Sequence, residues 1–177
     1  MKYLGLKVGQ KGVKVDEETL PSVRQALPPT NKTGLRRFLG MTGFYRKFIP
    51  SYAKVAAPLT KYLKGDRDET FELDADALQA HDDLKLAIKS APVLALPNKD
   101  GAFVLETDAS AAQLGVQLLQ TQPDGSYRPL GYWSRHCTPP ELNYSPTERE
   151  ALAIVRGIKK CRPYLERTRF VVRSDHQ

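Results

Sequence analysis

The stretch AFVLETDASAAQLGVQLLQ, residues 102–120, consists of two apolar runs separated by a short break of small residues. Both runs are rich in Val, Leu and Phe, which favours two β-strands joined through residues 109–112. The first strand ends on the carboxylate of Asp108, in the motif TDAS at 107–110. A carboxylate at the end of a core strand is costly unless something pairs with it. We therefore expect a partner for Asp108 elsewhere in the chain.

A third strand and a helix follow these two strands. The run YRPLGYWS, residues 127–134, comes after a loop that contains Asp124 and Gly125, which predicts a β-hairpin. Ser145, Pro146 and Glu148 then have the spacing of a helix N-cap with its capping box. The apolar side chains of this helix are expected at four positions, Ala151, Ile154, Val155 and Ile158. Pro163 is expected to end it.

The run RFVVRSD, residues 169–175, is a last strand that ends on a second carboxylate, Asp175. A strand that follows a helix in this way is expected to pair parallel with one of the earlier strands. The sequence thus predicts an α+β or α/β fold with three antiparallel strands, a helix, and a fourth strand parallel to the first.

The first part of the chain has a different pattern. A short hairpin is expected within residues 2–15, and helices are expected from a cap at Thr30 up to Pro50, over about 55–63, and from a cap at Asp74 to about residue 90. His81 lies on the apolar stripe of the last helix, where a packed histidine is far more common than a ligand. The polar loop at 65–68 is a plausible boundary between two parts.

The net charge of +7 is unevenly distributed. Residues 1–73 hold 14 Lys and Arg against 7 Asp and Glu, whereas residues 74–177 hold 13 of each. A basic first part suggests a polyanion, most often nucleic acid, as partner. We predict five contacts to it, at Lys32, Arg36, Arg37, Arg46 and Lys47.

Other features of the sequence exclude several classes of protein. No apolar run is long enough to cross a bilayer, and the N-terminus has no signal-peptide pattern. Cys137 and Cys161 lack the spacing of a zinc site or a disulfide framework. These features predict an intracellular protein without a membrane partner.

Asp108, Asp175 and Glu150 form the candidate site. If the first and last strands are parallel neighbours, both Asp side chains lie at one edge of the sheet, and a helix packed on that sheet brings Glu150 towards them. Converging carboxylates repel one another unless a hard cation such as Mg²⁺ binds between them. Two such ions can hydrolyse a phosphodiester. A structural role as turn or cap residues is equally open for these carboxylates on the pattern alone.

Several motifs in fixed order resemble the polyprotein of gypsy-like LTR retrotransposons. They are RRFLGMTGFYRKFIPSYAKVAAPLTKYLK, APVLALP, FVLETDAS, GYWSRHCTPPELNYSPTEREALAIV and FVVRSDHQ. The resemblance implies that residues 1–73 form the end of a reverse transcriptase palm and its thumb helices. It implies that residues 74–177 form a connection helix and the N-terminal part of a ribonuclease H-like domain.

The same resemblance implies an endonuclease that cleaves the RNA strand of RNA–DNA hybrids with two Mg²⁺ or Mn²⁺ ions. Its catalytic carboxylates fall on Asp108 in TDAS, Glu150 in TEREALA and Asp175 in RSDHQ. The polymerase palm motif and the rest of the ribonuclease H domain are not in this sequence. We therefore expect a truncated fold, an incomplete two-metal site, and weak or absent cleavage.

Two alternatives remain open at this point. The chain could be a non-catalytic nucleic-acid-binding remnant of such a polyprotein, or a degenerate reading frame without a selected function. For the parent polyprotein we expect an intracellular location, in a cytoplasmic virus-like particle or the nucleus.

Overall fold

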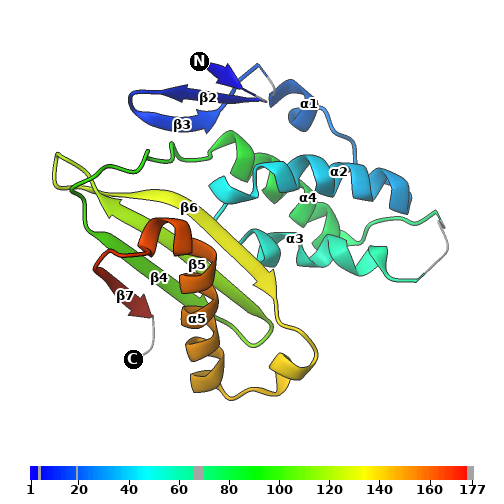
Figure 1. Cartoon of the computed structure of the whole chain (residues 1–177). Coiled ribbons are helices and arrows are strands. Elements are labelled where there is room, and N and C mark those ends of the chain that lie inside the picture. Colours follow the sequence, from blue (N-terminus) through cyan, green and yellow to red (C-terminus); the bar gives the residue numbers. More distant parts are fainter. Residues whose placement is uncertain (4, 19, 66–69, 175–177) are drawn as a thin grey trace.

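The computed structural model describes residues 1–3, 5–18, 20–65 and 70–174. Figure 1 shows an N-terminal hairpin, a group of helices, and a larger sheet with a long helix across it. The hairpin contains β1 (Lys2–Tyr3), β2 (Leu6–Gly9) and β3 (Gly12–Val15), which pair in that order, and it is followed by α1 (Leu20–Arg24). Val13 of β3 forms an antiparallel bridge with Leu94, which attaches the hairpin to the segment that leads into the larger sheet.

The helical group has boundaries close to those predicted. It consists of α2 (Lys32–Phe44), η1 (Arg46–Phe48), α3 (Tyr52–Thr60), η2 (Lys61–Leu63) and α4 (Ala75–Lys89). Asp74 caps α4 as expected, because its side chain accepts a hydrogen bond from Ala77 N. The cap of α2 is Asn31, whose side chain accepts from Gly34 N, so the assignment to Thr30 was wrong by one residue.

His81 is packed in the helical core, as its place on the apolar stripe predicted. Its side chain is 1% exposed, and its ring stacks on Phe38 with 4.4 Å between the ring centroids. This core is closed by α2, α3 and α4. Its fully or nearly buried members are Leu35, Phe38, Ala56, Leu59, Ala77, Ala80 and Leu84.

The larger sheet contains four strands within the described residues, in the order β6-β5-β4-β7. Their bounds are Phe103–Ala109 for β4, Gln113–Thr121 for β5, Tyr127–His136 for β6 and Phe170–Ser174 for β7. Strands β4, β5 and β6 pair antiparallel, and β7 pairs parallel with β4. This mixture of helices and a mixed sheet agrees with the predicted fold class.

Helix α5 (Pro146–Leu165) begins with the predicted capping box: Ser145 Oγ accepts from Glu148 N, and the Glu148 carboxylate accepts from Ser145 N. Three expectations for this helix were wrong. Pro163 lies inside its last turn. Ala151 and Val155, both expected in the core, are exposed, Val155 by 48%.

The buried residues of α5 are instead Ala153, Gly157, Cys161 and Leu165, spaced four apart. Three of the four are small, which lets the helix lie close to the sheet. A Cβ atom placed on Gly157 would be 3.2 Å from the side chains of Leu105 and Val116. The side chains of Leu105 and Val116 therefore point towards α5, and Gly157 permits the contact.

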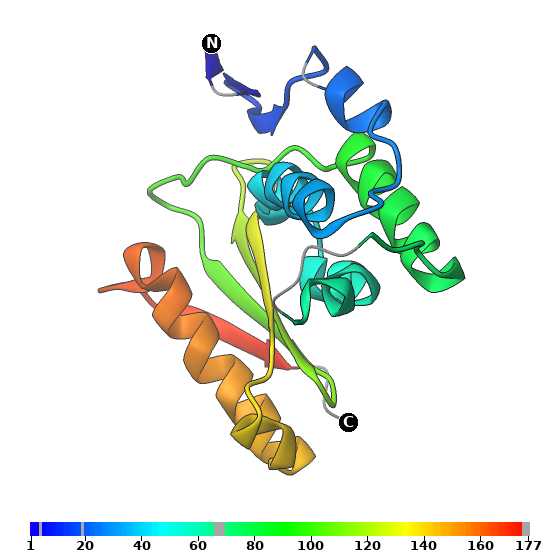
Figure 2. The ribbon, with the colours of Figure 1, turned by 90° about the vertical axis from the view of Figure 1, so that its right-hand side faces the viewer.

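The sheet separates two layers of helices. Figure 2 shows α5 on one face and α2, α3 and α4 on the other. The hydrogen bond from Ala53 N of α3 to Ser134 Oγ of β6 joins the helical group to the sheet. None of the described helices combines the length and the apolar character needed to span a membrane.

Candidate functional site

Asp108 is the penultimate residue of β4, and its side chain is exposed. It lines an open pocket of about 420 Å³, which we call the Asp108 pocket. The other lining residues are Pro50, Ser51, Glu106, Thr107, Gly115, Val116, Gln117, Tyr132, Arg173 and Ser174. The pocket therefore lies where strands β4, β5 and β7 meet the turn between η1 and α3.

Strand alternation explains why Asp108 faces this pocket. Leu105 points towards α5, so Glu106 and Asp108 lie on the opposite face of β4. The two carboxylates differ in their partners. Glu106 forms an ion pair with Arg173 at 3.4 Å. Asp108 makes no hydrogen bond or ion pair with any residue that the structure describes, so it is available to a ligand in the pocket.

Thr107 adds a second unsatisfied group at the same strand end. It is 5% exposed, and its hydroxyl oxygen is buried without a hydrogen-bond partner among the described residues. Buried polar atoms are rarely left unpaired in native structures, and the exceptions need an explanation. A polar ligand or water at this edge of the sheet would provide one.

The predicted third carboxylate, Asp175, lies outside the described residues. The described part of β7 ends at Ser174, which pairs with Thr107 in the parallel register of β4 and β7. Thr107 and Ser174 are the residues that directly precede Asp108 and Asp175 in the sequence.

Glu150 lies in the second turn of α5 and is half-buried. The described lining of the Asp108 pocket does not include it. No group of three or more His, Cys, Asp or Glu side chains among residues 1–3, 5–18, 20–65 and 70–174 is arranged to hold a metal ion. Nearby Glu148 has a structural role, because hydrogen bonds from Ser145 lower the pKa of its carboxyl.

Four of the five predicted nucleic-acid contacts are on the surface. Arg36 and Arg37 are exposed on α2, and Arg46 and Lys47 are exposed on η1. Lys32 is 7% exposed, and its ammonium donates a hydrogen bond of 2.9 Å to the carbonyl of Gly65. The structure therefore contradicts the prediction for Lys32. This side chain is buried and links α2 to the backbone at Gly65.

A buried carboxylate that connects β6 to α5 was not predicted from the sequence. Glu141, in η3 (Pro140–Asn143), is 6% exposed and binds Arg135 through two hydrogen bonds of 2.7 and 2.9 Å. Arg156 of α5 lies 3.7 Å from the same carboxylate. The Arg135 guanidinium, together with the Thr138 amide, lowers the pKa of Glu141 to about 2. The spacing of Thr138 and Glu141 in TPPE, that of a capping box, was the signal in the sequence.

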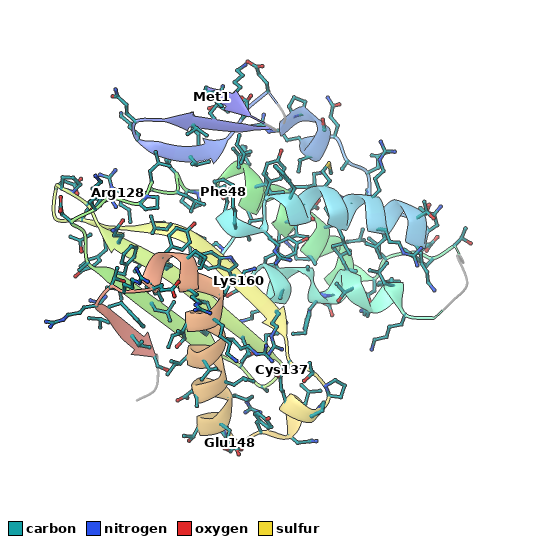
Figure 3. All side chains as sticks on the ribbon, viewed as in Figure 1. Met1, Phe48, Arg128, Cys137, Glu148 and Lys160 are labelled. Carbon is teal, nitrogen blue, oxygen red and sulfur yellow. The ribbon has the colours of Figure 1, made fainter. Side chains whose placement is uncertain are left out.

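A second open pocket, of about 350 Å³, was also missed. We call it the β6 groove, because it runs between edge strand β6, α5 and η1. Its lining residues are Arg46, Leu114, Val116, Trp133, Ser134, Arg135, Arg156, Lys159 and Lys160. The cations come from three separate elements, so no single motif in the sequence indicates them. Figure 3 labels Lys160 on α5.

Comparisons with known proteins agree with this architecture. The sequence model of the family described as "RNase H-like domain found in reverse transcriptase" matches residues 73–172. The retrovirus-related Pol polyprotein from transposon opus of Drosophila melanogaster is 38% identical over 187 residues, which cover 100% of this chain and 18% of that protein. The transposon Tf2-3 polyprotein of Schizosaccharomyces pombe is 35% identical over 179 residues, which cover 100% of this chain and 13% of that protein. The chain thus spans less than a fifth of these relatives.

Two solved structures have the same fold. The foamy viral protease-reverse transcriptase in complex with an RNA/DNA hybrid superposes with a TM-score of 0.85 and 19% identity, over 99% of this chain and 24% of that one. The foamy viral protease-reverse transcriptase dRH in complex with double-stranded DNA gives the same score and identity, over 99% of this chain and 31% of that one. At this identity the match supports the fold alone.

Proposed function

The chain belongs to the family of RNase H-like domains found in reverse transcriptases, and from this premise we propose that Asp108, Glu150 and Asp175 form a divalent-metal nuclease site. Its substrate would be the RNA strand of an RNA–DNA hybrid. Residues 1–73 would be the end of a polymerase palm with thumb helices, and residues 74–177 would carry the nuclease part.

The parallel register of β4 and β7 is the observation that carries this proposal. Because Thr107 pairs with Ser174, we propose that the next residues, Asp108 and Asp175, contribute carboxylates at the same end of neighbouring strands. Glu150 lies on α5, which packs on the other face of β4 and β5, and we propose that it supplies the third carboxylate around the end of β4. Asp108 is exposed and has no partner among the described residues, which favours a ligand at this edge.

The donor set suits Mg²⁺ or Mn²⁺, because both prefer carboxylate and water oxygens. Such ions, when bound, would activate a water molecule and stabilise the leaving oxygen of a phosphodiester. Asp108, which is exposed and has no partner among the residues that the structure describes, would hold an ion and orient its water. Arg173, which lines the same pocket and pairs with Glu106, would attract the phosphate.

Nucleic acid is the proposed partner for two reasons. The excess positive charge of residues 1–73 is displayed at Arg36, Arg37, Arg46 and Lys47, which are exposed. Proteins of the same fold have been solved with double-stranded DNA and with an RNA/DNA hybrid.

The test is Mn²⁺ binding measured by calorimetry on the whole chain, combined with cleavage of a hybrid that carries a labelled RNA strand. Three carboxylates are few ligands for two ions, so we expect slow cleavage and make binding the primary measurement. Asp108→Asn should abolish both signals. Asp100→Asn, which removes the same charge from an exposed loop, should change neither. Equal Mn²⁺ binding by the wild type and Asp108→Asn would sink the proposal.

A non-catalytic role in binding nucleic acid is the second candidate. It is favoured by the basic side chains exposed on α2 and η1, which can bind phosphates without a metal ion. It predicts that a hybrid binds with a steep salt dependence, equally well in the wild type and Asp108→Asn, and is never cleaved.

A further inference from the structure

The β6 groove is lined by five cations and, among the described lining residues, by no carboxylate. Arg135 and Arg156 are neutralised in part by Glu141. Arg46, Lys159 and Lys160 make no ion pair with any described residue. Three uncompensated charges therefore face one groove from two elements, η1 and α5. They repel one another there, so an anion that binds between them would be stabilised.

Trp133 provides an apolar wall beside these cations. It is half-buried, and its ring packs against the backbone of β6, since a Cβ atom on Gly131 would be 3.0 Å from it. Leu114 and Val116 continue the apolar floor. Cations beside an aromatic and aliphatic surface suit a sugar–phosphate chain that carries flat bases, because the phosphates contact the cations and the bases or sugars contact the apolar surface.

The groove is distinct from the proposed metal site. Its lining shares only Val116 with the Asp108 pocket, and it includes three residues of α5, whereas the described lining of the Asp108 pocket includes none. The groove therefore needs no metal ion to bind its ligand.

We propose that the β6 groove binds the phosphate backbone of a nucleic acid, as a contact separate from the Asp108 pocket. Arg46 on one wall and Lys159 and Lys160 on the other bind successive phosphates, while Trp133 contacts the sugar or base between them. The inference rests on the nucleic-acid partner of the proposed function, but it is independent of the metal chemistry.

The molecule contains a reporter for this site, because Trp133 is the only tryptophan in the sequence. Its emission is recorded while an RNA–DNA hybrid of defined length is added to the whole chain in EDTA, which removes divalent ions. We expect a saturable change in emission that weakens steeply with salt. The double variant Lys159→Ala/Lys160→Ala should reduce the slope of log K against log salt by about 2, since each lost phosphate contact lowers it by about 0.9.

The matched control is Lys89→Ala/Lys99→Ala, which removes the same charge from exposed positions outside the groove. It should keep the wild-type emission change and slope. Arg46→Ala tests the opposite wall and should reduce the slope by about 1. Thermal melts of each variant verify that the fold is intact.

Three outcomes would overturn the proposal. The first is hybrid binding without a change in Trp133 emission, which would place the contact elsewhere. The second is an equal response to poly-glutamate, which would make the groove a site for acidic peptides. The third is an equal decrease in the slope of log K against log salt in the Lys89→Ala/Lys99→Ala control. That result would mean that the salt dependence reports the net charge of the protein and not contacts in the groove. Loss of cleavage in Asp108→Asn with the emission change retained would separate this site from the metal site.

Discussion

The two faces of the four-stranded sheet serve opposite purposes, although the same strands build both. On one face, Leu105 is fully buried and α5 lies so close that Gly157 has no room for a larger side chain. On the other face, three residues further along β4, Asp108 is exposed beside an open pocket. Alternation along a strand lets neighbouring residues serve stability and function separately.

Two carboxylates, Glu141 and Asp108, show the same contrast between a structural and a functional position. Glu141 is buried against the face covered by α5 and is saturated with protein donors, from Arg135 and the Thr138 amide. Asp108 has no such partner among the described residues. A carboxylate that is already paired has little left to offer a ligand, whereas an unpaired one can bind a cation or hold a water molecule. The comparison therefore points to Asp108, and away from Glu141, as the functional group.

The largest predicted effect on stability is at the sheet face that α5 covers. Leu105→Ala should lower the free energy of unfolding by about 2–5 kcal/mol, because it removes a fully buried side chain and leaves a cavity between β4 and α5. Urea denaturation followed by circular dichroism measures the change. A loss no greater than that of an exposed substitution would mean that this face is not the tightly packed one.

Gly157→Leu should destabilise the fold by a smaller amount, about 1–3 kcal/mol, because the new side chain collides with Leu105 and Val116. The gain in helix propensity on replacing Gly, at most about 1 kcal/mol, offsets only part of this. Val155→Leu, on the exposed side of the same helix, is the control and should be nearly neutral in the same denaturation experiment. A stable Gly157→Leu would contradict the close approach of α5.

Glu141 predicts how stability depends on pH. Its pKa is about 2 in the folded protein, below its ordinary value near 4.5. The stabilisation that ionised Glu141 adds to the free energy of unfolding is therefore fully present above pH 4.5 and is lost as the pH falls towards 2. Thermal melts between pH 7 and pH 2 should show a fall in Tm for the wild type that is smaller in Glu141→Gln. Parallel curves for the two proteins would show that Glu141 is not the group responsible.

The smallest effect is predicted for Asp108→Asn. Because the side chain is exposed and has no partner within the described part of the chain, the free energy of unfolding should change by no more than about 0.5 kcal/mol in denaturation experiments, even though Mn²⁺ binding is lost. A large loss of stability would mean that Asp108 belongs to the structural carboxylates, like Glu141.

Local chemistry made much of the fold predictable. The capping box of Ser145 and Glu148, the Asp74 cap and the strand runs are all encoded within a few residues, so their positions agree with the structure. The exposed side of α5 was mispredicted, since large aliphatic residues were expected to face the sheet. The stripe of Ala153, Gly157 and Cys161 faces it instead, because small residues allow closer contact. Which side of the helix packs best depends on the shape of the sheet face that it contacts, and the pattern of residues along the helix contains no information on that shape.

The candidate site was also predicted only in part from the sequence. Asp108, Glu150 and the exposed arginines were identified from the sequence, and they remain the candidates, whereas Lys32 was not on the surface.

The sequence by itself determined, to within a few residues, where the main strands and helices begin and which strand ends on a carboxylate, because caps, turns and alternation act over a few neighbouring residues. Only the tertiary structure decided which charges are paired and which are free. Glu141 is neutralised by Arg135 and Arg156, and Arg46 faces the same groove as Lys160 across edge strand β6, from elements far apart in the chain. Electrostatic and packing energies depend on distances in space, and the fold sets those distances.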